Sequence, residues 1–140
     1  MAAGRPRSFY CNKELRENVD KYFNWCDEQI KVFEDSKGRQ TIIRKPYTLT
    51  GLCLYLNITR ETFAEYCKGR YDDDLNKFSD TFTYARKKVE NYIEEGTLNG
   101  SINHNAGAFN LKNNFNWSDK KEIDLKVEDL TVTIANDDEE

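Results

Sequence analysis

The stretch "LTGLCLYLNITRETFAEY", residues 49–66, decides the fold, because its pattern fits two short helices joined by a tight turn. Apolar side chains recur at helical spacing in both halves of the stretch: Leu52, Leu56, Ile58, Phe63 and Tyr66. Asn57 lies where the chain must reverse, and asparagine tolerates the left-handed backbone of such a turn. Thr59 can cap the second helix. The pattern predicts a helix-turn-helix-like unit over residues 48–68.

The outer side of the second helix carries acidic residues, although a DNA-reading helix would face phosphates there. Glu61 and Glu65 are the residues concerned. Similar patterns also form purely structural corners in helical proteins. The residues of this stretch are therefore compatible with a DNA-contacting unit and with a structural corner.

The charge of the chain is unevenly distributed along its length. The 140 residues predict one domain with a modest core, and the net charge of −4 argues against bulk binding of nucleic acid. Residues 1–70, however, hold 13 Lys/Arg against 9 Asp/Glu, whereas residues 119–140 hold 3 against 9. The basic and acidic ends therefore predict different partners.

The residues before the helical pair predict an arm, a helix and a β-hairpin. Residues 1–10 are small and basic and predict a flexible arm. Apolar residues follow helical spacing over residues 13–29, and Asn12 can cap that helix. β-forming residues flank Asp35–Gly38, which predicts a hairpin over residues 30–45.

A longer helix is predicted over residues 74–95 and interpreted as an oligomerisation helix. Asp72–Asp74 would open it, because acidic residues suit the positive end of a helix dipole, and Gly96 would end it. Heptad spacing forms one apolar seam, expected to be buried in part between subunits. The seam residues are Phe78, Phe82, Val89 and Tyr92.

The C-terminal residues predict one more helix and then a change of period. The helix would run from Ser101 to about Asn114 and complete a helical core over residues 11–118. Three apolar residues would then anchor the chain: Leu111, Phe115 and Trp117. Residues 119–140 predict a β-segment with an acidic tail. Its edges need partners, either the hairpin or identical strands of other subunits.

The chain lacks the patterns of an enzyme, a cofactor site or a metal site. His104 has no partners at metal-ligand spacing, and no glycine-rich phosphate loop is present. Four cysteines without a C-x-x-C pair predict reduced thiols. No apolar run reaches about 18 residues, so no membrane-spanning segment is expected. We therefore expect no catalytic residue, no cofactor and no metal.

Basic residues of the N-terminal half are the candidates for DNA contacts. "GRPR", residues 4–7, is similar to arms that enter a narrow A·T minor groove. The candidate DNA-binding residues are Arg5, Arg7, Lys37, Arg39, Arg44, Lys45, Arg60, Lys68 and Arg70.

Three stretches carry a resemblance to a known family. "YTLTGLCLYLNITRETFAEYCK", residues 47–68, and "NAGAFNLKNNFNWSDK", residues 105–120, resemble motifs of the small terminase subunits of tailed double-stranded DNA phages. The basic hairpin is similar to an insertion of that family. Asn116 stands where glycine is common, and asparagine can also adopt a left-handed conformation.

The resemblance implies a mainly α fold that assembles into a ring-shaped homo-oligomer. In some members a C-terminal β-segment of each subunit builds a shared barrel on the ring. The ring would recognise double-stranded viral DNA in the cytoplasm of the infected bacterial host. It would then recruit and regulate a large subunit that carries the ATPase and the nuclease. Avidity in a ring would also allow each helix to be weakly basic or even acidic.

Two other interpretations fit the same residues. A helix-turn-helix transcriptional regulator of a phage or bacterium would use the unit over residues 48–68 to read an operator, usually as a dimer. A structural adaptor would have no DNA affinity. Subunit count and binding at low salt distinguish the three.

Overall fold

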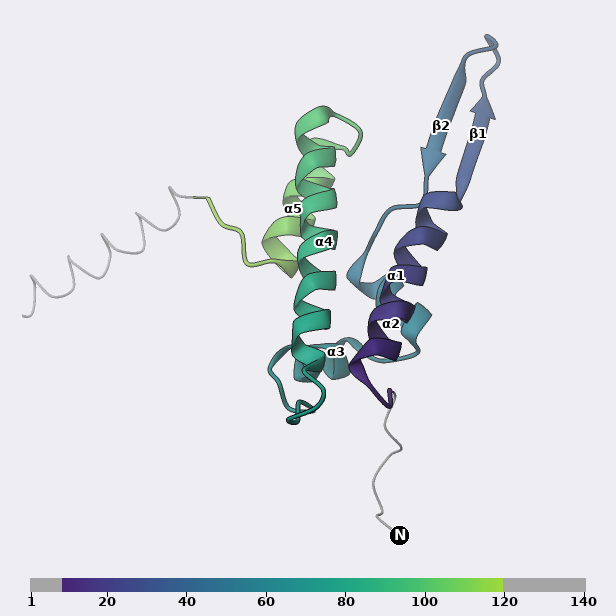
Figure 1. The fold of residues 1–140 in the computed structure, drawn as a ribbon. Helices are drawn as coiled ribbons and strands as arrows, with labels where there is room; N and C mark the ends of the chain where they lie inside the picture. The colour runs from purple at the N-terminus through teal and green to yellow at the C-terminus, as the bar shows by residue number, and fades with distance from the viewer. Residues whose placement is uncertain (1–8, 120–140) are drawn as a thin grey trace, which may run out of the picture. The chain divides into compact units, whose positions relative to one another are not determined.

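The computed structural model describes residues 9–119 and is mainly helical there, as the sequence predicts (Figure 1). In chain order the elements are α1 (Asn12–Glu28), β1 (Ile30–Glu34), β2 (Gln40–Arg44), α2 (Leu49–Leu56), α3 (Arg60–Cys67), α4 (Phe78–Asn99) and α5 (His104–Asn114). The backbone forms two compact units, residues 1–92 and 93–140. The predicted arm, except for its last two residues, and the C-terminal β-segment from residue 120 onward lie outside the described residues.

The predicted hairpin is confirmed as a two-stranded antiparallel sheet of β1 and β2 that extends beyond the end of α1 (Figure 1). Val32 lies opposite Ile42 in its register. The Asp35 carboxylate accepts hydrogen bonds from the backbone N–H groups of Lys37 and Arg39 at 2.9 and 2.8 Å, which fixes the turn. Gly38 adopts a φ of 79°, a backbone conformation that a side chain would strain.

α1 begins one residue earlier than predicted, and its N-cap is Cys11 instead of Asn12. Asn12 instead makes two hydrogen bonds to residues near the start of α4. Its side-chain oxygen accepts a hydrogen bond from the Thr81 hydroxyl at 2.6 Å, and its N–H donates to the Asn76 side chain at 2.8 Å. These bonds join the start of α1 to the start of α4.

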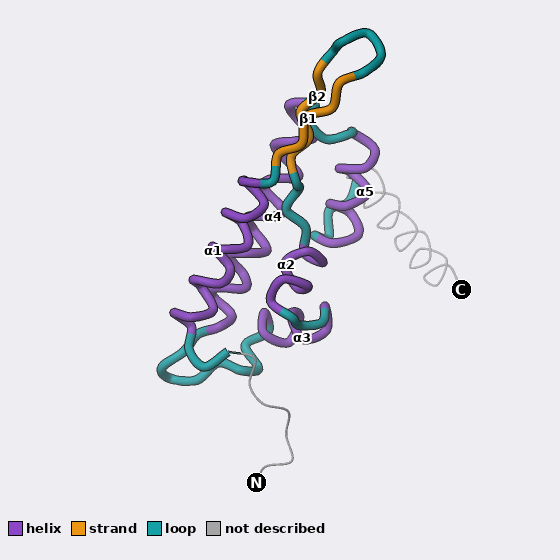
Figure 2. The backbone as a smooth tube through the Cα atoms, turned by 90° about the vertical axis from the view of Figure 1, so that its right-hand side faces the viewer, coloured by secondary structure: helices purple, strands orange, loops and turns teal. Residues whose placement is uncertain are grey.

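α2 and α3 are the two short helices predicted for residues 48–68, and Figure 2 shows the short loop between them. Asn57 is left-handed with a φ of 59°, as predicted. The Thr59 hydroxyl caps α3 by accepting a hydrogen bond from the Thr62 N–H at 3.0 Å. Gly69, with a φ of 83°, follows the end of α3.

The start of α4 differs from the prediction, because the helix begins at Phe78 instead of residue 74. The acidic run makes a turn before the helix. The Asp73 carboxylate accepts hydrogen bonds from the N–H groups of Leu75 and Asn76, and the Asp72 carboxylate accepts one from Ser79. Short acidic side chains compete with the helix for backbone donors, which explains the delay.

The end of α4 also corrects the prediction, because Gly96 lies inside the helix, which runs on to Asn99. A Cβ at Gly96 would overlap the side chain of Ile102, so the glycine permits close packing there. Gly100 takes the left-handed conformation after the helix, with a φ of 84°. α5 then begins at His104 with Asn103 as its N-cap, three residues later than predicted.

The apolar seam of α4 is buried inside the chain itself. Phe78, Phe82 and Val89 are at most 1% exposed. Tyr92 is half-buried and lies 4.7 Å from the Tyr47 ring. The predicted role of the seam between subunits stays untested, but three of its four residues have no exposed surface to offer another subunit.

Replacing the most central seam residue tests this packing. Phe82→Ala should lower the free energy of unfolding by about 3–5 kcal/mol, because it leaves a cavity among aromatic rings. Leu75→Ala is the control, since Leu75 is 91% exposed and should change the value by less than about 0.5 kcal/mol. Urea unfolding followed by circular dichroism measures both. Equal effects of the two substitutions would contradict the assigned core.

Candidate functional site

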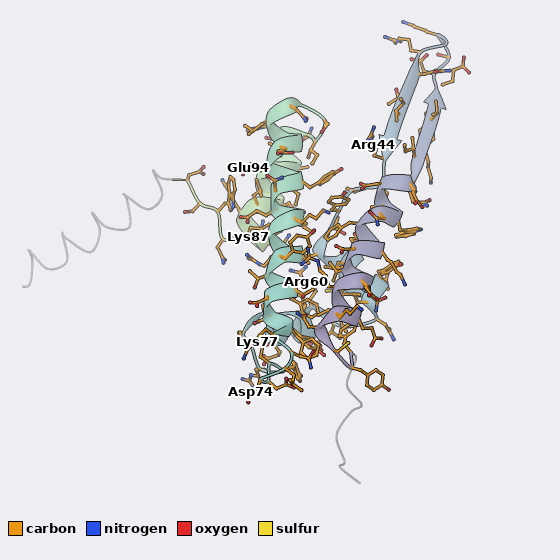
Figure 3. The ribbon with its side chains drawn as sticks, in the orientation of Figure 1. Arg44, Arg60, Asp74, Lys77, Lys87 and Glu94 are labelled. Carbon is orange, nitrogen blue, oxygen red and sulfur yellow. The ribbon has the colours of Figure 1, made fainter. Side chains whose placement is uncertain are left out.

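The candidate basic residues of the hairpin lie in two places, the turn and the base. Lys37 and Arg39 are in the turn, where the Arg39 side chain pairs with Asp35 at 3.0 Å. Arg44 ends β2, as Figure 3 shows, and Lys45 follows it. Arg5 and Arg7 lie outside the described residues.

A groove at the base of the hairpin brings three cations together. It has a volume of about 270 Å³ and is lined by Trp25, Gln29, Lys31, Ile43, Arg44, Lys45 and Pro46. The Lys45 ammonium lies 4.9 Å from the centroid of the Trp25 ring, a cation–π contact. Because the cations Lys31, Arg44 and Lys45 line one concave surface, their positive potentials add there. We call it the basal groove.

Trp25 and Lys31 were not among the site residues that the sequence predicts. Trp25 is 39% exposed, with its ring centroid 5.7 Å from that of Tyr55. One signal was available in the sequence. Trp25 lies between the buried positions Tyr22 and Cys26 of α1, at the edge of the apolar stripe, where a large aromatic side chain reaches the surface.

The acidic residues of α3 differ in their surroundings. The Glu65 carboxylate pairs with the Arg70 guanidinium at 2.5 Å, so its charge is offset by a neighbour. Glu61 is exposed in the first turn of α3, where it favours the helix dipole. The Arg60 guanidinium donates a hydrogen bond to the Thr50 hydroxyl of α2 at 3.3 Å. Arg60 therefore contacts α2, and Glu65 pairs with a cation that follows the end of α3.

A second groove lies within residues 93–119, between the end of α4 and α5. Its volume is about 440 Å³, and its lining includes Glu94, Leu98, His104, Ala108, Leu111 and Trp117. Leu111 and Phe115 are buried, whereas Trp117 is 40% exposed, so burial supports the predicted anchor at the first two residues only. The φ of 62° at Asn116 turns the chain and leaves the indole in the groove wall. We call it the α4–α5 groove.

The described residues offer little for metal or thiol chemistry. Within residues 9–119 no group of three His, Cys, Asp or Glu side chains could hold a metal ion. All four cysteines are free thiols, and burial raises the pKa of Cys53 to about 11, which keeps it protonated. None of the described helices has the length and apolar character that crossing a membrane requires.

The sequence matches a family of known proteins. The family model of the DNA-packaging protein gp3 matches residues 4–123, so the chain belongs to that family. This membership agrees with the resemblance to terminase small subunits and gives the chain a role in phage genome packaging. Among curated proteins, none matches the chain.

Replacing the N-cap residue Thr59 tests the hydrogen bond that stabilises the start of α3. Thr59→Ala should lower the free energy of unfolding by about 1 kcal/mol, because the Thr62 N–H loses its acceptor. Thr59→Ser keeps the oxygen and should restore most of that value. Thermal unfolding of both variants provides the measurement, and equal stabilities of the alanine and serine variants would contradict the assigned cap.

Proposed function

We propose that the chain is the non-catalytic small terminase subunit of a tailed phage, which recognises viral genomic DNA and recruits and regulates the large ATPase–nuclease subunit. The family match over residues 4–123 carries the proposal. The protein would act as a ring of identical subunits in the cytoplasm of the infected host. Packaging proteins of this class work on double-stranded DNA, so the chain needs a surface that binds phosphates.

The basal groove is the best-supported DNA contact of the described residues. Residues 29–46 hold five Lys/Arg against two Asp/Glu, a surplus of +3, whereas residues 57–70 hold three against two, a surplus of +1. Each phosphate neutralised by a cation releases counterions, so affinity follows the local surplus. Trp25 adds an exposed aromatic edge beside Lys45. The hairpin would therefore position the duplex, and α3 would contribute less.

In a ring, a surface that binds DNA only weakly in each subunit would be sufficient for tight binding. Each subunit would contribute only a few phosphate contacts, and repetition around the ring would multiply them through effective concentration. An acidic Glu61 would then limit binding by single subunits, which leaves selection of the DNA site to the assembled ring.

The α2–α3 pair supports a second candidate, a transcriptional regulator that reads an operator. Two short helices joined at Asn57 fit such a role. A regulator of this kind binds as a dimer whose reading helices lie one DNA turn apart. Sedimentation distinguishes the two, because packaging predicts a mass of many subunits.

Removing the three groove cations should weaken DNA binding without regard to sequence. In the triple variant Lys31→Ala, Arg44→Ala, Lys45→Ala, the slope of log affinity against log salt should flatten by about three units per bound subunit. A matched triple, Lys13→Ala, Lys77→Ala, Lys87→Ala, removes the same charge from exposed positions elsewhere. Fluorescence anisotropy with a labelled duplex between low and physiological salt measures both. Equal losses in the two triples would remove the basal groove from the DNA surface.

The two tryptophans provide a direct reporter, because they are almost equally exposed, at 39% for Trp25 and 40% for Trp117. In Trp117→Phe, duplex DNA should quench or shift the emission of Trp25, and added salt should reverse the change. In Trp25→Phe, the emission of Trp117 should stay constant. Emission changes at Trp117 alone would place DNA away from the hairpin.

A further inference from the structure

The basal groove combines an apolar lining with a cationic one. Trp25, Ile43 and Pro46 supply the apolar lining, and Lys31 and Lys45 are among the cations. Lys31 and Ile43 are partners across the two strands, so their side chains lie next to each other. The phosphates of a duplex need only the cations. The apolar lining therefore indicates a ligand that carries an apolar group beside its negative charge.

The Trp25 indole is held in place by other aromatic rings. Its centroid lies 6.4 Å from that of Tyr22, which has no exposed surface, and 5.7 Å from that of Tyr55, which is 42% exposed. The indole is nevertheless 39% exposed. A ring that is already fixed by its neighbours loses little conformational entropy when a ligand packs against it. Trp25 is thus a preformed aromatic platform in the groove wall.

The Lys45 ammonium lies beside this platform, 4.9 Å from the indole centroid. The Lys45 backbone N–H donates a hydrogen bond to the Gln29 carbonyl at 3.1 Å, which fixes the start of the side chain at the groove. Stacking of a base on an aromatic ring is stronger than an exposed cation–π contact. A base on the indole would therefore displace the ammonium, which would then pair with the phosphate of the same nucleotide.

The size and the polar groups of the groove suit one nucleotide. Its volume of about 270 Å³ lies below the roughly 300–1,000 Å³ of drug-sized ligand sites. The exposed side-chain amide of Gln29 lines the groove and has both donors and an acceptor for the edge of a base. In a duplex the faces of the bases are stacked and their pairing edges are used. An unpaired base offers both to a protein.

We infer that the basal groove binds single-stranded DNA, with an unpaired base stacked on Trp25 and its phosphate held by Lys31 and Lys45. The inference rests on the proposed function, which brings viral DNA to this groove, and it adds the form of DNA that the groove accepts. Duplex phosphates would reach the cations without using the indole. Because unpairing a base costs free energy, the groove would favour DNA sites where the strands separate easily.

Two oligonucleotides that differ only in their bases test the inference. One is a fluorescently labelled thymidine strand, and the other is an abasic strand of the same length, which keeps the phosphates. The full wild-type chain should bind the thymidine strand more tightly. In Trp25→Leu, which keeps an apolar side chain without an aromatic ring, this ratio of affinities should fall by about 5-fold or more. Fluorescence anisotropy at one fixed salt concentration measures all four affinities.

Three further variants separate stacking from charge and from folding. Trp117→Leu is the matched control, because Trp117 is 40% exposed but lines the other groove, and it should keep the wild-type ratio. Trp25→Phe keeps an aromatic ring and should restore part of the ratio. Lys31→Ala should weaken both strands alike, because both carry phosphates. Circular dichroism checks that every variant keeps wild-type helicity.

The emission of Trp25 gives a second test that leaves the groove unchanged. In Trp117→Phe, Trp25 is the only tryptophan. At equal occupancy the thymidine strand should quench its emission more strongly than the abasic strand, because only a stacked base contacts the indole. Equal quenching by the two strands would overturn the inference even if Trp25→Leu failed to fold.

The remaining outcomes separate this inference from the proposed function. An unchanged ratio in Trp25→Leu, or the same fall in Trp117→Leu, would overturn the inference and leave duplex binding through phosphates standing. Equal losses of duplex and thymidine-strand affinity in Trp25→Leu would also overturn it, because the indole would then only maintain the shape of the groove. A wild-type chain that binds the thymidine strand but no duplex would support the inference and contradict the proposed function.

Discussion

The buried ring of Phe82 is the contact on which the arrangement of residues 9–92 depends. Its centroid lies 5.2 Å from that of Phe63 and 4.7 Å from that of Tyr66, and both partners belong to α3. Phe9 approaches the same ring at 6.2 Å and ties the start of the described chain to it. α3 has only eight residues, too few to be stable in isolation. Its position, and with it that of Arg60, is therefore set by the aromatic core.

A second set of contacts holds the base of the hairpin. The Tyr22 hydroxyl donates to the Thr48 carbonyl at 3.3 Å and accepts from the Thr48 N–H at 3.2 Å. The Tyr47 hydroxyl donates to the Asp27 carboxylate at 2.5 Å, and burial together with this bond raises the pKa of Tyr47. These bonds tie the chain leaving β2 to α1. Trp25 on α1 and Lys45 after β2 are thereby held together in one groove.

Local patterns predicted the elements whose structure is decided locally. The hairpin follows from its turn residues, and the α2–α3 pair follows from Asn57 and Thr59, whose backbone and capping roles act over a few residues. The resemblance to the family rested on residues 47–68, residues 105–120 and the basic hairpin. These parts need no knowledge of distant contacts.

Several of the differences from the prediction arise from contacts that a local sequence pattern does not reveal. Asn12 does not cap α1 as predicted, because its side-chain oxygen accepts a hydrogen bond from the hydroxyl of Thr81, 69 residues away. The sequence predicts a helix end at Gly96, whereas α4 continues through this glycine, which makes room for the Ile102 side chain. Seam spacing cannot show whether the same chain or another copy covers Phe82. The basal groove was missed in part because Trp25 and Lys31 meet only when α1 and the hairpin are folded.

Hydrogen exchange of the assembled protein with and without duplex DNA tests the central claim most directly. The claim is that the hairpin and its basal groove, rather than α3, hold the DNA. The account predicts slower exchange over residues 29–46 when DNA binds, with little change over residues 60–67. Protection confined to residues 60–67, with the hairpin unchanged, would contradict it.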